Sequence, residues 1–398
     1  MSGTARVRRA SMPPYSRPMA PQRPTTSEPP AIAGVRRSFV VARGVRFHVT
    51  EAGPADGRPV IALHGWPQHH WVYRDLLADP PEGMRIIAPD LPGYGWSGPP
   101  PHRWAKDDVA ADVLALMDAL GIDRTLLVGH DWGGFVGYRM LLAAPARFDG
   151  YLVCNMAHPW QSPRTTLPHF WRLLAYQPFV ASAGVALHRR TPYLKRMIFA
   201  AGPKQHRIEP AAARIYADRF RDPVCARAAT DTYRTFLLRE LPSAVKHPEQ
   251  RRTTIPIRVL FGMHDFAVHP SLASPRTAMA DDYTFEAVDA GHFVIDERPD
   301  LVRARLIELA QSTGSRGARA ADDAEVVDRS EFSRPLPPAP RNQAVAANRA
   351  RRSVMRASAS AMMRSISSAT VGTSWIKPAT MPQLQAPASM VPSIMIFG

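Results

Sequence analysis

The segment Val128-Gly129-His130-Asp131-Trp132-Gly133-Gly134 decides the fold of this 398-residue chain. It continues the apolar run 125–128, which is typical of a buried strand, and leads into a helical pattern that extends to about residue 144. Small residues close to Asp131 on both sides are what a sharp strand-to-helix turn needs, because the backbone crowds there. Such a turn projects its central side chain over the sheet edge, beside the backbone N–H groups of a helix N-terminus.

The residue at the centre of this turn is an aspartate, whereas serine is the usual occupant. A carboxylate is ionised at neutral pH and can attack a saturated carbon directly. It therefore predicts displacement through an alkyl-enzyme ester. A Gly-x-Asp-x-Gly turn alone is explained equally well as a tight turn with a capping aspartate, so the prediction depends on partners elsewhere in the chain.

The chain around this segment alternates strand patterns with helical patterns. An opening hairpin is expected at 38–50, helices are expected at 107–120 and 298–311, and further strands are expected at 60–63, 84–89, 151–154, 257–261 and 283–288. This alternation predicts an α/β fold with a mostly parallel sheet and helices on both faces. Ligands bind at the carboxyl edge of such a sheet.

Residues that can take part in catalysis follow the predicted strands. His64-Gly65-Trp66-Pro67 follows the strand 60–63, and the backbone N–H groups of Trp66 and Trp132 are candidates for an oxyanion hole. Asp265 follows the strand 257–261, and His292 follows the last strand. Nucleophile, acid and histidine thus appear in the order Asp131, Asp265, His292, which is the chain order of the α/β-hydrolase arrangement.

Residues 38 to about 312 resemble an α/β-hydrolase of the epoxide hydrolase and haloalkane dehalogenase branch. The motifs that carry the resemblance are H-G-W-P at 64–67, D-L-P-G-Y-G-W-S at 90–97, G-H-D-W-G-G at 129–134, G-M-H-D at 262–265 and G-H-F at 291–293. The resemblance implies a catalytic domain at 38–312. It also implies a helical cap at about 158–254, inserted before the last two strands.

The roles expected of the site follow from this arrangement. Asp131 is the predicted nucleophile and His292 the predicted general base, while Asp265 is expected to hold His292 in the productive tautomer. Asp289 is the rival orienting residue, but it lies only three residues before His292. His130 and His264, which flank the catalytic positions, are interpreted as packing or supporting residues.

The cap distinguishes the two branches of the family, because an epoxide oxygen must be protonated as it leaves whereas a halide needs only N–H donors. Similar epoxide hydrolases carry two cap tyrosines for this purpose. Tyr233-Arg234 is similar to the family's Asn-Trp-Tyr-Arg segment, although Asp-Thr replaces Asn-Trp here, and Tyr176-Gln177-Pro178 is more loosely similar to the other region. Trp66 also fits the epoxide side, since many dehalogenases have asparagine at that position.

Two other functions stay open. One is a haloalkane dehalogenase that releases halide, and the other is a non-catalytic α/β-hydrolase scaffold whose basic tails bind a polyanion. The expected partners are water and a small apolar epoxide or haloalkane, and a homodimer is left open. No cofactor is expected. No metal is expected either. His64 and His69-His70 cluster in one loop, but no tight spacing of carboxylate and histidine residues recurs, as a metal site would need.

Charge and composition separate the two ends of the chain from its centre. Residues 1–37 and 312–398 each contribute +6 to the formal net charge of +16. Both tails, 1–37 and 313–398, lack sustained periodicity and are expected to be disordered. Specific nucleic-acid binding is therefore not expected of the catalytic domain.

The sequence also bears on the location of the protein. Its two cysteines do not suggest a disulfide framework, and no apolar run is long enough for a membrane span. A cytoplasmic location is therefore expected.

Overall fold

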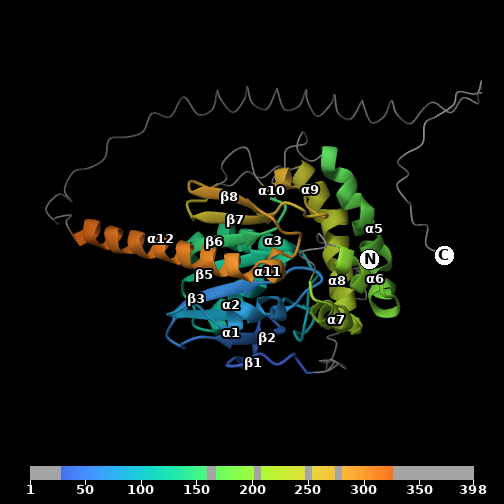
Figure 1. Cartoon of the computed structure of the whole chain (residues 1–398), viewed down its shortest axis with the longest axis horizontal. Helices are drawn as coiled ribbons and strands as arrows, with labels where there is room; N and C mark the ends of the chain where they lie inside the picture. The colour runs from blue at the N-terminus through green and yellow to red at the C-terminus, as the bar shows by residue number, and fades with distance from the viewer. Residues whose placement is uncertain (1–27, 159–166, 201–207, 247–252, 274–279, 326–398) are drawn as a thin grey trace, which may run out of the picture. The chain divides into compact units, whose positions relative to one another are not determined.

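An eight-stranded sheet forms the centre of the computed structural model, which describes residues 28–158, 167–200, 208–246, 253–273 and 280–325 (Figure 1). The strand order is β1-β2-β4-β3-β5-β6-β7-β8. β1 pairs with β2 and β2 with β4 in antiparallel fashion, and all other pairs are parallel. The strands are β1 (Arg36–Ala42), β2 (Val45–Ala52), β3 (Arg58–Leu63), β4 (Met84–Pro89), β5 (Thr125–His130), β6 (Phe148–Cys154), β7 (Ile257–Gly262) and β8 (Tyr283–Val288).

Alternate residues of the central strands supply two separate hydrophobic cores, as the two-residue period of a strand requires. In β3, Ile61 and Leu63 join a core that includes residues of α2 (Lys106–Ala119) and α3 (Asp131–Ala143). Val60 and Ala62 join the core that packs against α12 (Pro299–Glu325). The sheet is therefore covered on both faces, and its carboxyl edge is left to carry the site. The expected α/β fold, a mostly parallel sheet with helices on both faces, is confirmed.

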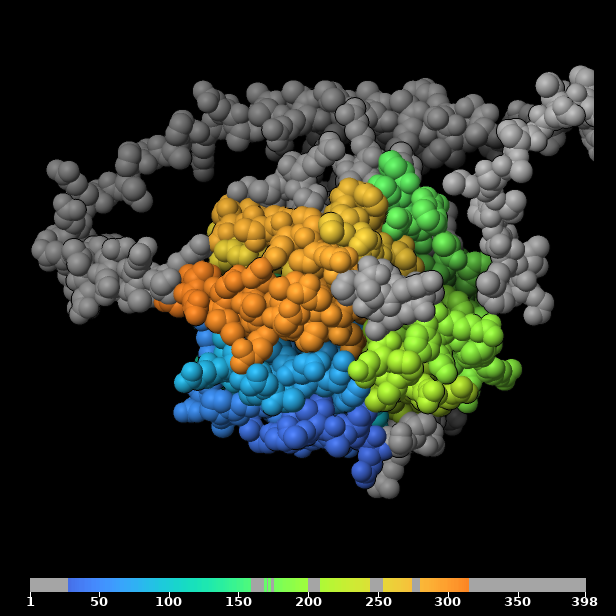
Figure 2. Space-filling view, viewed as in Figure 1, coloured from blue at the N-terminus to red at the C-terminus, as the bar shows by residue number. Residues whose placement is uncertain are grey.

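A helical insertion separates β6 from β7, and its helices lie together beyond one end of the sheet (Figures 1 and 2). Smaller elements complete the core. The insertion contains η3 (Leu167–His169), α5 (Phe170–Arg190), α6 (Tyr193–Ala200), α7 (Pro210–Arg219), α8 (Pro223–Thr235), the π-helical turn η5 (Phe236–Glu240) and α9 (Leu241–Lys246). The core adds η1 (His70–Tyr73), α1 (Arg74–Ala78), η2 (Pro145–Arg147), α10 (Pro270–Ala273) and α11 (Val294–Glu297).

The last helix differs from the expectation. α12 ends at Glu325, whereas the sequence pattern ends at 311, so the helix enters the segment that was expected to be disordered from 313. The apolar period of the sequence stops near residue 311, but residues 316–325 contain four alanines and two arginines, which have a high helix propensity. The remainder of that tail, and residues 1–27 of the other, lie outside the described residues.

Both cysteines are buried and free: Cys154 lies in β6 and Cys225 lies in α8. In the part of the chain that the structure describes, no helix is long and apolar enough to cross a membrane.

Candidate active site

The turn between β5 and α3 places Asp131 where the two elements meet. Asp131 has a φ of +48°, in the left-handed region that non-glycine residues rarely adopt. The turn also packs tightly against the loop after β3. A Cβ on Gly133 would lie 2.3 Å from the His64 carbonyl oxygen, and a Cβ on Gly65 would lie 2.5 Å from the Asp131 Cβ. Glycine at both positions therefore permits the close approach that holds Asp131 at the sheet edge.

Backbone N–H groups surround the Asp131 carboxylate. The Trp66 N–H donates to Oδ2 across 2.9 Å, and the Trp132 N–H at the start of α3 also hydrogen bonds to the carboxylate. Burial raises the pKa of Asp131, while His292 and these two N–H groups act in the opposite direction. The Trp66 N–H thus points at Oδ2, and the Trp132 N–H points at the same carboxylate. This is the geometry of an oxyanion hole.

His292 and Asp265 lie together, as the sequence predicts. His292 Nδ1 is 2.8 Å from Asp265 Oδ2, and both side chains are almost fully buried. Burial by itself lowers the pKa of His292, but the charge of Asp265, its hydrogen bond and then the charge of Asp131 raise that pKa to about 9. The imidazole thus interacts with both carboxylates.

The rival orienting residue has a different partner. Asp289 accepts from His264 Nε2 at 2.9 Å, and both side chains are about half exposed. His130, which flanks the nucleophile, is buried, and its Nε2 lies 2.9 Å from the His292 carbonyl oxygen. Burial, followed by the nearby His292, lowers the pKa of His130 to about 3, so this ring is neutral.

Asn155 supports Asp265, and the sequence analysis missed it. It follows β6 with a φ of +43°, a conformation that asparagine tolerates better than most residues. Its Nδ2 donates to Asp265 Oδ2 at 2.8 Å, and its Oδ1 accepts from the Gly262 N–H at 3.1 Å. A polar residue directly after an apolar strand was the available signal, because strand ends meet at one edge of the sheet.

Glu297 is a second residue that the sequence analysis missed. It lies at the end of α11, and its carboxylate accepts from the backbone N–H groups of Gly291 at 2.5 Å and Phe293 at 3.1 Å. Those two residues flank His292. Glu297 therefore holds the loop that carries His292, the predicted base, and its charge adds to the factors that raise the pKa of His292.

The helical insertion brings Tyr176 and Tyr233 to the site. Their rings lie 5.7 Å apart, and Tyr176 stacks on Trp66 at 6.0 Å. Tyr233 packs edge-on against Trp66 at 5.1 Å and against Trp132 at 5.4 Å. Burial is the main factor that raises the pKa of each tyrosine, and the charge of Asp131 adds to it. Both expected tyrosines thus contact Trp66, in the loop after β3, and Tyr233 also contacts Trp132, the residue after Asp131.

The Trp66 indole N–H is already engaged. It donates to His188 Nε2 across 3.2 Å, and His188 Nδ1 in turn lies 2.5 Å from the Gly184 carbonyl oxygen. Burial lowers the pKa of His188 to about 4, so this histidine is neutral and its Nε2 can accept a hydrogen bond. The Trp66 side chain therefore contributes an aromatic surface to the site, while its backbone N–H faces Asp131.

Comparison with known proteins places the chain in a family. Residues 58–299 match the family model of the alpha/beta hydrolase fold. The chain belongs to the alpha/beta hydrolase family.

Relatives of this alpha/beta hydrolase include proteins named haloalkane dehalogenase and epoxide hydrolase. It is 27% identical to haloalkane dehalogenase 2 of Mycobacterium tuberculosis (H37Rv) over 71% of its own length and 97% of that protein. It is 24% identical to epoxide hydrolase 4 of Mus musculus, over 66% of its own length and 76% of that protein. The solved structure of ALR0039, described as an alpha/beta hydrolase from Nostoc sp. PCC 7120, shares the fold with a TM-score of 0.62 at 24% identity, covering 69% of this chain and 98% of that one.

One histidine cluster of this alpha/beta hydrolase has a residue set that could hold a metal ion. His48, His70 and Asp90 are buried, and their potential ligand atoms lie within 4.8 Å of one another. Asp90, however, accepts from the two Nδ1 atoms at 2.9 Å each and from the backbone N–H groups of His70 at 2.7 Å and Trp96 at 2.9 Å. These donors account for both carboxylate oxygens, so hydrogen bonding alone explains the cluster.

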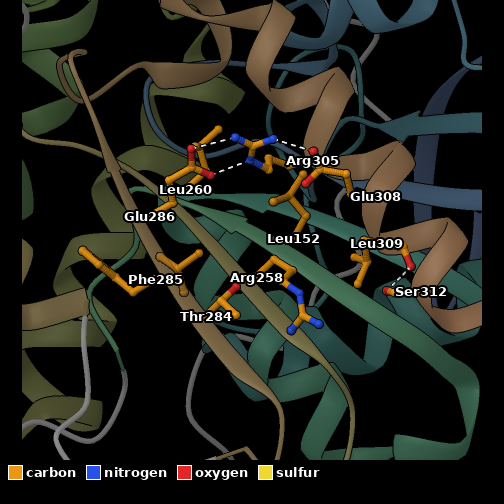
Figure 3. Close-up of a pocket in the computed structure, with 11 residues that line it drawn as sticks. Leu152, Arg258, Leu260, Thr284, Phe285, Glu286, Arg305, Glu308, Leu309 and Ser312 are labelled. Carbon is orange, nitrogen blue, oxygen red and sulfur yellow. Dashed lines mark hydrogen bonds and ion pairs between the residues drawn. The ribbon is translucent and has the colours of Figure 1, made fainter.

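A groove elsewhere on the hydrolase is separate from the predicted catalytic residues. It has a volume of about 370 Å³ and is lined by residues of β7, β8 and α12 (Figure 3). Arg305 in this groove forms ion pairs with Glu286 at 2.5 Å and with Glu308 at 2.6 Å. None of the predicted catalytic residues lines the groove.

Proposed function

We propose that this alpha/beta hydrolase converts epoxides to vicinal diols through an alkyl ester on Asp131. The observation that carries the proposal is the placement of Tyr176 and Tyr233 together, in contact with Trp66 beside the Asp131 carboxylate. Epoxide opening produces an alkoxide, which needs a proton donor. The raised pKa values of both tyrosines keep their hydroxyl groups protonated at neutral pH. They are therefore suited to donate hydrogen bonds to the epoxide oxygen.

The first half of the proposed reaction forms the ester. Asp131 Oδ1 attacks an epoxide carbon, the carbon–oxygen bond of the ring breaks, and the released oxygen takes a proton from a tyrosine hydroxyl. Asp131 Oδ2 keeps its hydrogen bond from the Trp66 N–H. Aromatic side chains around the carboxylate provide the apolar surface that a small hydrophobic substrate needs.

The second half releases the diol. His292 takes a proton from water, and the hydroxide attacks the carbonyl carbon of the Asp131 ester. The negative charge that develops on Oδ2 is stabilised by the N–H groups of Trp66 and Trp132. The bond between the carbonyl carbon and the alkyl oxygen then breaks, and the departing oxygen takes the proton from His292 to complete the diol. The Asp131 carboxyl group loses its proton to solvent, and the tyrosine that protonated the epoxide oxygen regains a proton from solvent. Formation of the ester removes the Asp131 charge, which is one of the factors that raise the pKa of His292. The ester therefore favours the neutral, basic form of His292 at the step that needs it.

The insertion works as the cap in this proposal. It covers the site with α5 and α8, which carry Tyr176 and Tyr233. In this position it selects the substrate. Its expected limits are about 158–254; β6 ends at Cys154 and β7 begins at Ile257.

Haloalkane dehalogenation is the alternative with the same nucleophile, and the similarity to haloalkane dehalogenase 2 is its support. A departing halide needs N–H donors. The Trp66 indole N–H is engaged with His188, which leaves the buried indole N–H of Trp132 as the candidate donor. One assay separates the two functions. Diol formation from styrene-type epoxides is expected to exceed halide release from short chloroalkanes or bromoalkanes. The reverse result would assign the dehalogenase activity, and inactivity in both would favour a non-catalytic scaffold.

The covalent step has its own test. A single turnover in ¹⁸O-labelled water is expected to place the label in the Asp131 carboxylate, because water attacks the ester carbonyl carbon and not the substrate. Mass spectrometry of the peptide that contains Asp131 locates the label. Label found only in the diol would contradict the ester mechanism.

A further inference from the structure

Lys106 is a buried cation that the proposed mechanism leaves unused. It is the first residue of α2, and it is only 1% exposed. Two general effects disfavour a cation at this place. The N-terminus of a helix carries a partial positive charge, and a buried charge loses its hydration. A lysine here therefore needs contacts that offset the free-energy cost of burying its charge.

The Lys106 ammonium connects the core to the helical insertion. Its Nζ donates to the Thr232 carbonyl oxygen across 2.8 Å and forms an ion pair with Glu240 Oε2 at 2.7 Å. The Lys106 backbone N–H also donates to Glu240 Oε1 at 2.7 Å. Thr232 directly precedes Tyr233, and Glu240 ends the π-helical turn η5. Turns of this kind occur frequently at functional sites.

The same ammonium lies over the Trp132 indole, with Nζ 4.4 Å from the ring centroid. A cation at this distance is attracted to the face of the ring. Trp132 follows Asp131 in the chain, and its indole packs edge-on against the Tyr233 ring. One cation thus contacts both the residue that supplies an oxyanion N–H and the segment that carries a proposed proton donor.

We propose that Lys106 is a positioning residue that fixes Trp132 and Tyr233 relative to Asp131. This inference rests on the proposed function of those three residues. Burial lowers the pKa of Lys106 to about 8, while Glu240 on η5 and Asp131 on α3 act in the opposite direction. The ammonium therefore loses its proton in mildly alkaline solution, and its contacts with the Trp132 ring and the Thr232 carbonyl weaken there.

A purely structural role and a positioning role predict different results. Neutral side chains of similar size often replace a buried ion pair without loss of stability. The double variant Lys106→Met/Glu240→Gln is therefore expected to keep its thermal unfolding midpoint. Its kcat for epoxide hydrolysis is expected to fall about tenfold with little change in KM, since small displacements of catalytic groups are costly. Lys195→Met, a change in α6 of the insertion, is the matched control and is expected to keep full activity.

A second measurement uses no substrate, so its failure is distinguishable from the failure of the proposed function. In full-length protein labelled with ¹⁵N-tryptophan, the indole resonance of Trp132, assigned with Trp132→Phe, is expected to titrate with a midpoint near pH 8. The double variant is expected to lose this transition and Lys195→Met to keep it. An unchanged Trp132 resonance in the double variant would overturn the inference. So would wild-type kcat in that variant.

Discussion

The charge of His292 depends on the two carboxylates that surround it. Asp265 contributes more than Asp131 to its raised pKa of about 9, and burial alone would lower this pKa. In the free protein the imidazole is therefore protonated at neutral pH. Removal of either carboxylate charge returns it toward the neutral form.

Asp131→Asn is expected to lower the pKa of His292, because it removes a negative charge and leaves the shape of the side chain nearly unchanged. Asp265→Asn is expected to lower it further, since Asp265 also supplies the hydrogen bond at 2.8 Å. Histidine NMR over a pH titration measures both shifts. Asp289→Asn is the control, because Asp289 contacts His264, and an equal shift in that variant would contradict the assignment.

Variants of Asp131 and His292 are expected to stop the proposed cycle at different steps, so that ester formation and ester hydrolysis can be measured separately. His292→Ala is expected to form the Asp131 ester and to release it very slowly, because no base activates water. Intact-protein mass spectrometry should then show an increase equal to the mass of one epoxide. Asp131→Ala is expected to show neither the increase nor turnover. An active Asp131→Ala protein would show that the nucleophile lies elsewhere.

Tyr176→Phe and Tyr233→Phe each remove one hydroxyl and keep the aromatic packing. Each is expected to slow ester formation about 10²-fold, in the range of a lost general acid, and the double variant is expected to lose more. Rapid-quench measurement of ester formation checks this. Tyr193→Phe on α6 is the control and should keep its rate. If both single variants formed ester at the wild-type rate, the tyrosines would be packing residues.

At the scale of elements, Asn155 joins the ends of β6 and β7 to the histidine loop. Its side chain bonds Asp265 and the Gly262 N–H, and it also donates to the Gly291 carbonyl oxygen at 3.3 Å. Its position after β6 orients Asp265, so we expect a change at this residue to affect both stability and the proposed catalysis.

Asn155→Ala is expected to lower the free energy of unfolding by about 2–4 kcal/mol, because it leaves buried polar groups without partners and places alanine at a positive φ. Denaturant unfolding measures the loss. Asn155→Gly is the matched control. It removes the same hydrogen bonds but tolerates the φ, so it should be less destabilised by about 1 kcal/mol. Equal losses in both variants would show that backbone conformation contributes nothing at this position.

At the scale of the whole molecule, the residues proposed for catalysis lie between Trp66 and His292 and their supporting contacts end at Glu297. Most of the net charge lies outside this part, in 1–37 and 312–398. A chain shortened to residues 28–326, which retains the whole of α12, is therefore expected to keep full activity. Its salt-sensitive binding to polyanions should fall, since few of the tail charges remain. Activity present only in the complete chain would contradict this division.

The sequence by itself determined the fold class, and it predicted which three residues would lie at the carboxyl edge of the sheet. Strand and helix periods are local properties, and the order of the motifs after successive strands defines which residues meet at the carboxyl edge. The placement of Asp131, Asp265 and His292 was predictable for this reason, as was that of the Trp66 and Trp132 N–H groups, while their catalytic roles stay predictions. The sequence also indicated Tyr176 and Tyr233, although only through a resemblance.

Tertiary structure alone decided the contacts between elements that are distant in the chain. It paired Asp289 with His264, a contact that the sequence pattern did not indicate. It likewise brought Asn155, His188 and Lys106 to the site from three different elements. No local pattern encodes such contacts, because each depends on how a strand end, an inserted helix or a core helix packs against the others.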